Sequence, residues 1–488
     1  MSKTELKSKS LTPLEFFEEK KKYISNQYNK AADKRDFWIK KNKYYYDYLT
    51  KVLRCIVEPQ SKVLQIKCET GYFLNAVNPQ YGLGIDSSEK MIEIAATNFP
   101  KLNFKLSGFE NFSCKEKFDY VLLINVLGDI LDIQKSLQAL NQIITVETRI
   151  VIINYSSLWK PLLAIAAYFN IKIKQPTQNW LSLHDVENLL HLSGYETIKN
   201  SYIILAPIGI PLISNFFNYF VAKLPFIQKL CFNHLVIAKK NAHLPKNEGY
   251  SVSVVIPCMN EKGNIENAVR RVPKMGKHTE IIFCDDKSGD GTSKEVLRVK
   301  KHYPDKDIKL YEGPGICKAR NIWIGFDNAQ GDILMILDAD LTVIPEELPL
   351  FYSAIVEGKA EFINGSRLVY PMRENSMKFL NILGNKFFSV LFSYILNQKI
   401  KDTLCGTKVM WRKDYFRIKK FFGEFGPEDL WGDHVLIFGA AKINLKIIDL
   451  PIHYFDRVHG ETKMTKVFGN GIRMLRICIA ALTKLRFF

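Results

Sequence analysis

Residues 332–340 read DILMILDAD, an apolar run that ends directly in two aspartates separated by one residue. A short continuous apolar run bounded by polar residues is typical of a buried strand. In open α/β sheets ligands bind at the carboxyl ends of the strands, so Asp338 and Asp340 lie where a site is expected. Two such carboxylates suit a hard divalent cation, Mg²⁺ or Mn²⁺, although solvated turn acids would give the same pattern.

Similar apolar runs recur on both sides of this stretch and alternate with helical stretches. The acids Asp285 and Asp286 follow the run EIIFC in the way that Asp338 follows DILMIL. Alternation of strand and helix implies a mostly parallel, doubly wound sheet. The predicted strands of this half are SVSVVIP (251–257), EIIFC (280–284), IKLY (308–311), DILMIL (332–337) and AEFI (360–363).

The first half of the chain shows the same alternation, and a polar stretch, KKNAHLPKNEGY (239–250), separates the two halves. Its predicted strands are VLQI (63–66), GLGI ending at Asp86, FDYVLLI (118–124) and RIVII (149–153). We therefore predict an α/β protein with two doubly wound domains. The predicted parts are a helical extension (1–60), a first domain (61–240), a linker (241–250), a second domain (251–470) and a basic amphipathic tail (471–488).

The net charge of +18, from 68 Lys+Arg against 50 Asp+Glu, favours an anionic partner. Nucleic acid is not expected, because the sequence has no helix-turn-helix pattern, zinc finger or aromatic RNA-binding signature. The stretches 376–399 and 466–488 are basic and amphipathic, which suits helices in a lipid headgroup layer. Core packing with a basic solvent face is the alternative. We expect an anionic membrane surface as a partner.

The sequence favours a cytoplasmic protein, peripheral on the membrane. Its nine cysteines form no C-x-x-C pair, and the N-terminus lacks the apolar region of a secretory signal. The most apolar long stretch, 203–230, is interrupted by prolines, asparagines and lysines. We expect it to be buried or interfacial and not to span a membrane.

Four segments in the second half follow one another in order: SVVIPCMNEKGNI (253–265), FCDDKSGDGT (283–292), KARNIWIGFDNAQGD (318–332) and LDADLTVIPEEL (337–348). Together they closely resemble a family 2 glycosyltransferase with the GT-A fold, especially the branch related to polyprenyl-phosphate sugar synthases. The later segments DTLCGTKVMWR (402–412), LWGDHVLIFGAAK (430–442) and LPIHYFDRVHGETKM (450–464) are also similar to this family. The resemblance implies a nucleotide-sugar donor and an inverting transfer.

The resemblance also implies roles for individual residues. Asp338 and Asp340 would hold the metal and the diphosphate, although Thr342 stands where that branch often has Gln. Asp286 would accept a hydrogen bond from the base. The implied nucleotide-sugar-binding residues are Pro257, Asn260, Glu261, Asp286, Lys318, Arg320 and Asp338.

Asp433, in the WGDH segment, is the candidate general base, because inverting transfer to a hydroxyl needs a group that accepts its proton. A helix-cap role is the alternative, and an ionised phosphate acceptor would need no base. Relatives often have a second acid near position 435, where this sequence has Val435. A basic group that could clamp an acceptor phosphate or the leaving diphosphate comprises Arg367, Arg457, His459 and Lys463; a solvated basic loop is the alternative.

The first half is similar to a class I S-adenosylmethionine (SAM)-dependent methyltransferase. The resemblance rests on VLQIKCETGYFLNAV (63–77), GLGIDSSEKMIEIAATNFP (82–100), FDYVLLINVLGDI (118–130) and RIVIINYSSLW (149–159). It implies that Asp86 would meet the ribose hydroxyls.

The pocket of that first half departs from the family pattern. Lys67 and Glu69 replace glycines that let the backbone approach a cofactor, and only Gly71 of that pattern remains. Gln65 replaces an acid, and the third motif appears as SGFE around Gly108. The degenerate SAM pocket therefore comprises Lys67, Glu69, Gly71, Asp86 and Gly108, with Lys67 paired to Glu69 in a plugged site.

The sequence thus predicts a metal-dependent inverting glycosyltransferase that uses Mg²⁺ or Mn²⁺. Its acceptor would be a polyprenyl phosphate or another lipid-linked or cell-surface glycan. Its methyltransferase-like domain would no longer use SAM and would serve for docking or acceptor presentation. The alternatives are a bifunctional enzyme that also methylates the glycan, and a first domain that is a non-catalytic scaffold for partners.

Overall fold

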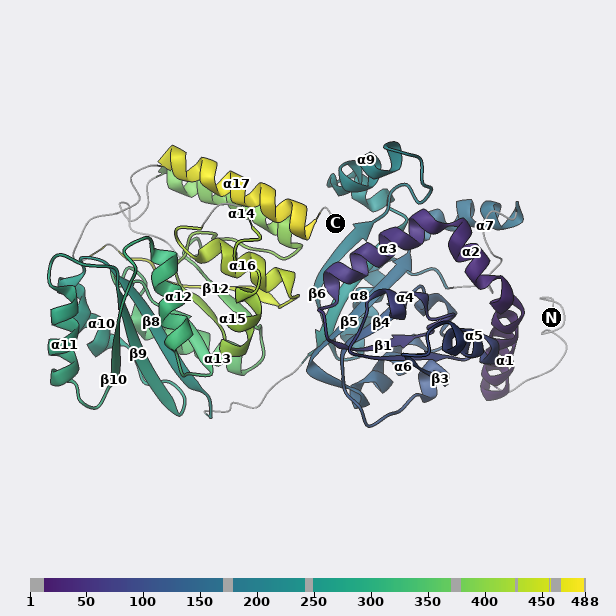
Figure 1. Ribbon diagram of the computed structural model, residues 1–488, viewed down its shortest axis with the longest axis horizontal. Helices are drawn as coiled ribbons and strands as arrows, with labels where there is room; N and C mark the ends of the chain where they lie inside the picture. The colour runs from purple at the N-terminus through teal and green to yellow at the C-terminus, as the bar shows by residue number, and fades with distance from the viewer. Residues whose placement is uncertain are drawn as a thin grey trace. The chain divides into compact units, whose positions relative to one another are not determined.

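The computed structural model describes residues 13–169, 179–241, 249–369, 379–425, 429–455, 457 and 467–486. The chain divides into two compact units, Met1–Asn241 and Ala242–Phe487, each with its own sheet (Figure 1). Both units are α/β, so the fold class predicted from the sequence is confirmed. Each unit is described separately below.

The first unit begins with three helices before its first strand. Its elements are α1 (Pro13–Ala31), α2 (Arg35–Lys41), α3 (Lys43–Ile56), β1 (Lys62–Ile66), α4 (Tyr72–Ala76), β2 (Tyr81–Asp86), α5 (Glu89–Asn98), β3 (Asn103–Leu106), β4 (Phe118–Ile124), α6 (Ile133–Ala139), β5 (Ile144–Tyr155), α7 (Lys160–Tyr168), α8 (Leu183–Leu192), β6 (Tyr195–Ile203), α9 (Ile213–Tyr219) and β7 (Asn233–Lys240).

The sheet of the first unit has the strand order β3-β2-β1-β4-β5-β7-β6. Strands β1 to β5 are parallel, and β7 runs antiparallel to both of its neighbours. The sequence predicted β1, β2, β4 and the buried half of β5, whose apolar runs are continuous. It missed β3, β6 and β7; β3 is a largely exposed edge strand, and β6 mixes polar with apolar residues, so neither has a continuous apolar run.

The second unit alternates strands and helices from its first residues. Its elements are β8 (Ser251–Cys258), α10 (Ile265–Arg271), β9 (His278–Asp285), α11 (Thr292–His302), β10 (Asp307–Glu312), α12 (Lys318–Asn328), β11 (Ile333–Ile336), α13 (Leu348–Val356), β12 (Phe362–Ser366), α14 (Phe379–Leu396), β13 (Lys408–Trp411), α15 (Arg412–Lys419), α16 (Asp433–Lys442), β14 (Ile447–Pro451) and α17 (Val467–Leu485).

The second sheet has the strand order β10-β9-β8-β11-β13-β12-β14. Only β13 runs against the others, because it pairs antiparallel with both β11 and β12. The remaining pairs are parallel, so the loops after β8, β9 and β11 leave the same edge of the sheet. That edge carries the acids singled out in the sequence.

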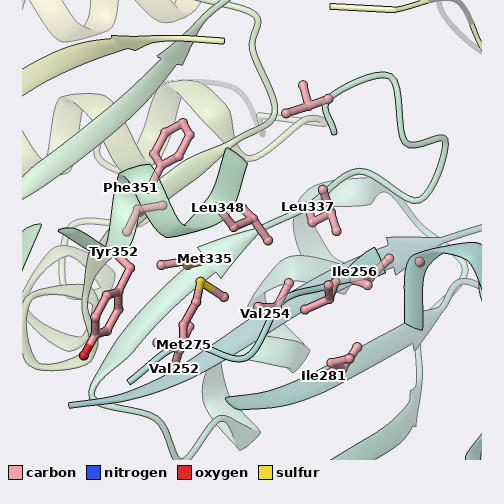
Figure 2. Packing of buried hydrophobic residues seen from close by; sticks show 14 of the residues in the cluster. Val252, Val254, Ile256, Met275, Ile281, Met335, Leu337, Leu348, Phe351 and Tyr352 are labelled. Carbon is pink, nitrogen blue, oxygen red and sulfur yellow. The ribbon is translucent and has the colours of Figure 1, made fainter. Parts of the chain in front are cut away.

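The central strands are buried on both faces, which explains their continuous apolar sequences. On one face, side chains of β8 and β11 pack against α13, as Figure 2 shows for Val254, Met335 and Phe351. On the other face, α12 approaches very closely: a Cβ on Gly325 would lie 2.3 Å from a methyl carbon of Val255. This tight packing fixes the N-terminus of α12 beside the acidic edge.

Helices α14 and α17 cover the second face and contribute to its core. Phe392 of α14 and Ile477 of α17 are both buried in the same apolar cluster. Their opposite faces expose Val390 and Ile479. Core packing therefore accounts for one face of each helix and leaves the other face apolar and exposed.

None of the helices formed by the described residues has the length and apolar content needed to cross a bilayer.

Candidate active site

The two aspartates of the DAD sequence each meet a cation. Lys318, the first residue of α12, places Nζ 2.5 Å from Oδ1 of Asp338. Arg457 places Nη2 2.6 Å from Oδ2 of Asp340. The other oxygen of Asp340 accepts hydrogen bonds from the backbone N–H of Thr342, at 3.2 Å, and from its hydroxyl, at 2.9 Å. The fold thus brings together four of the residues predicted from the sequence.

The backbone around Asp338 is shaped for close approach. A Cβ on Gly406 would lie 2.2 Å from Oδ2 of Asp338, so only glycine lets the loop before β13 lie against this carboxylate. This glycine belongs to the DTLCGTK segment. The loop therefore packs directly against this carboxylate.

The charged groups around Asp338 shift one another's pKa values. Burial raises the pKa of Asp338, but the charges of Lys318, Lys408 and Arg367 outweigh burial and hold that pKa below its usual value. Burial lowers the pKa of Lys318, and the carboxylates of Asp338 and Asp433 more than reverse this. Both groups therefore stay charged near neutral pH.

Asp433 belongs to the same cluster through Lys408. Nζ of the fully buried Lys408 lies 3.4 Å from Oδ1 of Asp433. Apart from this ion pair, that oxygen accepts no hydrogen bond from the described residues. Burial raises the pKa of Asp433, and the nearby Lys408 and Lys318 only partly offset this. Asp433 is therefore a more basic carboxylate than an exposed aspartate.

In the structure Asp433 does not cap helix α16. The residue before α16 is Gly432, with φ +84°, and Asp433 is the first helical residue. The cap is Asp429, whose Oδ2 accepts the backbone N–H groups of His434 at 2.8 Å and Val435 at 3.1 Å. Sequence reasoning missed this role of Asp429.

The predicted nucleotide loops are joined to one another. Pro257 lies within the last residues of β8, and Asn260 follows with φ +53°. Oδ1 of Asn260 accepts the N–H of Gly289 at 2.9 Å, and the N–H of Glu261 donates to Oγ1 of Thr292 at 3.0 Å. These bonds hold the loop after β8 against the loop after β9.

Asp286 lies at the same edge and is buried. Its N–H donates to the carbonyl oxygen of Cys258 at 2.9 Å, and its Oδ1 accepts the N–H of Gly315 at 2.7 Å. Arg320, in the first turn of α12, is exposed to solvent. The edge therefore combines a buried, hydrogen-bonded acid, Asp286, with an exposed cation, Arg320.

Arg367 is bound by a partner that the sequence analysis did not identify. Its Nε and Nη2 donate to the two oxygens of Asp402 at 2.7 Å and 2.9 Å, and its backbone N–H donates to Oδ2 at 3.0 Å. Asn385 adds a fourth bond to this carboxylate, at 2.7 Å. Arg367 therefore reaches a phosphate only if it shares its guanidinium with Asp402. His459 and Lys463 lie outside the described residues.

The chemistry of Asp338 and Asp340 fits a divalent cation held jointly with a ligand. Asp338 and Asp340 supply two carboxylates, each now neutralised by a cation of the chain. Across the described residues, no group of three or more His, Cys, Asp or Glu side chains is placed to hold a metal ion. Mg²⁺ commonly takes one or two carboxylates and completes its shell with phosphate oxygens and water.

In the first unit, the loop after β1 keeps a glycine-like backbone although it has lost the glycines. Lys67 has φ +54° and Glu69 has φ +50°, values at which a Cβ is disfavoured. Gly71 has φ +81°, and a Cβ there would lie 2.9 Å from the ring of Phe104. The turn is retained, but two side chains now project from it.

The expected Lys67–Glu69 pair is wrong. Lys67 forms an ion pair with Asp129, and its Nζ lies 2.8 Å from the hydroxyl of Tyr28. Glu69 instead accepts a hydrogen bond from Nε of Arg35 at 2.8 Å. The partners come from α1, α2 and the loop after β4. Lys67 and Glu69, which both have positive φ, therefore direct their side chains to different groups.

Asp86 is engaged by its own loops. It is buried, and its oxygens accept the backbone N–H groups of Ser88 and Glu69, each at 2.9 Å. Burial raises the pKa of Asp86 to about 6, against the opposing effect of those N–H groups and of Lys67. Gly108 has open space where a Cβ would stand. This carboxylate therefore holds the plugged loop in place.

Helix α1 lies across the carboxyl ends of these strands. Ser25 donates to the carbonyl oxygen of Ser87 at 2.7 Å, and Tyr28 donates to Oδ2 of Asp129 at 2.8 Å. Lys21 lies 2.7 Å from Glu110. These contacts reach the loops after β2, β3 and β4, so the helix covers the edge where a doubly wound sheet binds its ligand.

Residues 253–417 match the family model described as Glycosyl transferase family 2, so the second unit contains a domain of this family. A dolichol-phosphate mannosyltransferase of Pyrococcus furiosus is 29% identical over 219 residues, which are 44% of this chain and 59% of that protein. An undecaprenyl-phosphate 4-deoxy-4-formamido-L-arabinose transferase of Salmonella paratyphi B is 29% identical over 138 residues, which are 27% of this chain and 42% of that protein. The chain thus spans about half the length of these curated relatives.

Solved structures match each unit at low identity. A SAM-dependent methyltransferase from Thermotoga maritima aligns with 45% of this chain and 100% of its own, at 14% identity and a TM-score of 0.36. A glucosyl-3-phosphoglycerate synthase from Mycobacterium tuberculosis, in complex with Mn²⁺ and UDP, aligns with 49% of this chain and 80% of its own, at 15% identity and a TM-score of 0.35. The recognition of a glycosyltransferase domain joined to a methyltransferase-like fold is confirmed.

Proposed function

We propose that the protein is a metal-dependent, inverting glycosyltransferase that moves a sugar from a nucleotide sugar to a polyprenyl phosphate or another lipid-linked or surface-glycan acceptor. The observation that carries this proposal is the pair of neighbouring ion pairs, Lys318 with Asp338 and Arg457 with Asp340. The family match over residues 253–417 gives the reaction class. The two curated relatives have polyprenyl phosphates in their names, which supports that acceptor class.

Asp338 and Asp340 would hold Mg²⁺ or Mn²⁺, which neutralises a leaving diphosphate as a Lewis acid. Lys318 and Arg457 are placed to turn from the carboxylates to the diphosphate when the donor arrives. Asp286 would accept a hydrogen bond from the base. The two loops that carry Asn260 and Asp286 are already fixed, so the nucleotide meets a preorganised edge.

Asp433 would take the proton of a hydroxyl acceptor, because burial makes it more basic and its Oδ1, which forms an ion pair with Lys408, accepts no hydrogen bond from the described residues. An ionised phosphate acceptor needs no proton removed. In that case Asp433 would balance the charges of Lys408 and Lys318. The acceptor class therefore decides whether Asp433 is a base or a counter-ion.

We propose that the first unit no longer uses SAM. Lys67 and Glu69 occupy glycine positions of the loop, Asp86 is bound to backbone amides, and α1 lies across the same edge. This combination favours a unit that docks or presents the acceptor. The bifunctional alternative requires the side chains of this loop to leave their partners.

The substitutions Asp340→Ala and Asp340→Asn test the metal assignment. We expect a fall in kcat of a hundredfold or more in the presence of Mn²⁺, because charge stabilisation of the diphosphate is lost. The asparagine variant can keep the bond from Thr342, which protects the loop from unfolding. Transfer is measured from a panel of nucleotide sugars to a short-chain polyprenyl phosphate.

Asp307→Ala is the matched control, since Asp307 forms an ion pair with His278 whose side chain is 56% exposed. Its turnover should equal that of the wild type. Full turnover in the Asp340 variants, or wild-type turnover that persists after chelation of divalent ions, would refute the metal assignment.

A further inference from the structure

The first unit carries an exposed apolar surface on two segments, residues 158–169 and 208–230, which we call the apolar face. Of thirty large apolar side chains exposed in the described chain, fifteen lie in these segments. The exposed fraction is 86% for Leu212 and 90% for Phe226. Soluble proteins rarely expose large contiguous apolar patches without a partner.

Helix α9 is inverted relative to a helix of a soluble protein. Its polar residues Ser214 and Asn218 are fully buried, whereas Phe216 and Phe220 are exposed. Oδ1 of Asn218 accepts the backbone N–H groups of residues 205 and 206, at 2.7 Å and 2.8 Å. The polar side chains therefore fasten the helix to its unit, and the apolar side chains point outward by construction.

Helix α7 extends the same surface. It has no buried residue although most of its side chains are apolar. Nε1 of Trp159, directly before the helix, donates to the carbonyl oxygen of Leu230 at 2.8 Å. The Trp159 ring also packs edge-on against Phe232, with 5.1 Å between ring centroids. These contacts join the two segments, which Figure 1 shows as short helices at the surface of the first unit.

The charge within the two segments themselves has one sign. The sequence has no acid between Glu147 and Asp185, and none between Glu196 and Glu248. Lys160 and Lys229 are exposed within or beside the two segments. Apolar side chains bordered by lysines and free of acids complement the headgroup layer of an anionic bilayer.

We propose that the apolar face inserts into the headgroup and upper acyl region of an anionic phospholipid bilayer, and that the first unit is thereby a membrane anchor. This inference deepens the proposed function, because a lipid-linked acceptor lies in such a bilayer. A protein partner or a second copy would also cover apolar side chains. The exposed Lys160 and Lys229, together with the lack of any acid within the two segments, favour the lipid surface over both.

Vesicle flotation of the full-length protein tests this anchor. We expect flotation with phosphatidylcholine vesicles that contain phosphatidylglycerol, and weaker flotation with phosphatidylcholine alone, by about fivefold for each lysine near the surface. The variants Phe216→Asp with Phe220→Asp, and separately Phe226→Asp, should each lower vesicle partition at least tenfold. These side chains are exposed, so their replacement leaves the core intact.

Phe37→Asp is the matched control, because Phe37 is 61% exposed in the same unit but lies outside the two segments. It should float like the wild type. Equal flotation of all variants, or no flotation of the wild type, would overturn the inference. So would a wild-type dimer that the α9 variant converts to monomer in light scattering without any change in flotation.

The enzymatic proposal is separable from the anchor. Transfer to a water-soluble short-chain acceptor should be unchanged in the Phe216→Asp, Phe220→Asp variant. Vesicle binding without any transfer would therefore contradict only the proposed function, and transfer without vesicle binding would contradict only the anchor.

Discussion

At the residue scale, the Arg367–Asp402 pair shows how burial changes the weight of one contact. Asp402 has no exposed surface and accepts bonds from Arg367 and Asn385. Burial raises its pKa, and the Arg367 charge and these hydrogen bonds more than reverse this, to about 2. Removal of one partner of a buried pair leaves the other uncompensated.

We therefore predict that Asp402→Asn lowers the free energy of unfolding of the second unit by about 3–5 kcal/mol at pH 7. The folded pKa of about 2 lies below the unfolded value of about 3.9, so this stabilisation is present above pH 4 and is lost as the pH falls through 2. Chemical denaturation at pH 7, 4 and 2.5 measures it. The gap between wild type and variant should narrow with acid.

The exposed Arg271–Glu346 pair is a geometric control, because it is also bidentate, with bonds of 2.7 Å and 2.9 Å. Glu346→Gln should cost less than about 1 kcal/mol. Equal losses for Glu346→Gln and Asp402→Asn at pH 7 would contradict the role given to burial.

Sequence reasoning found some residues of the site and missed others for a physical reason. Asp338 and Asp340 follow a strand signal, and that local pattern placed them at the sheet edge. Asp402 and Lys408 act through partners far along the chain, and no periodicity reports such contacts. The pairing of Lys67 with Glu69 failed for the same reason, since α1 and α2 supply the actual partners.

At the element scale, the N-terminus of α16 carries two acids with different work. Asp429 caps the helix by accepting two backbone N–H groups, whereas Asp433 forms an ion pair with Lys408. Burial raises the Asp429 pKa, and His434 and the hydrogen bonds overcome this and lower it to about 2. For Asp433, burial dominates and raises the pKa. The start of α16 is therefore flanked by one acid that stabilises the helix and one acid that is a candidate base.

We predict that Asp429→Ala lowers the free energy of unfolding by about 1–2 kcal/mol, as expected for a lost cap. Asp433→Asn should leave that free energy closer to the wild type and lower kcat by about a hundredfold or more with a hydroxyl acceptor. The acid limb of the wild-type rate profile should lie above the pKa of an ordinary aspartate, because burial raises that of Asp433. Denaturation and pH–rate measurements on both variants check this.

The reverse pattern, with Asp433→Asn unstable and Asp429→Ala inactive but stable, would contradict the assignment. If the acceptor is an ionised phosphate, the rate with that acceptor should fall much less in Asp433→Asn than the rate with a hydroxyl acceptor. Equal losses with both acceptors would exclude proton transfer as the role of Asp433.

The strands themselves were predictable to different degrees. Fully buried parallel strands such as β4 and β8 are continuous apolar runs, and the sequence located them within a residue at each end. The antiparallel β13 is only four residues long and begins with Lys408, so its apolar run is too short to indicate a strand. Topology around β13 therefore required the structure, although its neighbours did not.

At the scale of the whole molecule, the two units differ in how well their residues suit the ligands expected from the sequence. The second unit has a cluster of charged side chains around Asp338 and Asp340, which we propose binds a metal and a diphosphate. The first unit has filled its own loop edge with Lys67, Glu69 and α1 and exposes an apolar face. Our two proposals therefore assign catalysis to the second unit and membrane binding to the first.

The division of fold and function was accessible from sequence because each unit repeats the strand and helix alternation. The apolar face was not predictable from the sequence, because the composition of residues 203–230 is compatible with either burial or an interface. The structure distinguishes these alternatives, since the polar side chains of α9 point inward and its apolar side chains are exposed. Hydropathy reports that a segment is apolar, whereas the direction of each side chain depends on which groups its polar residues reach.

A thermal-shift panel on the full protein tests the central claim most directly. It compares UDP and GDP, with and without Mn²⁺ or Mg²⁺, against SAM and S-adenosylhomocysteine. A ligand at a hundred times its Kd stabilises the unit that binds it by about 2.7 kcal/mol, which is measurable. The account predicts a metal-dependent shift with one nucleotide and none with either methyl-donor compound. A shift with SAM, or no metal-dependent shift with any nucleotide, would contradict it.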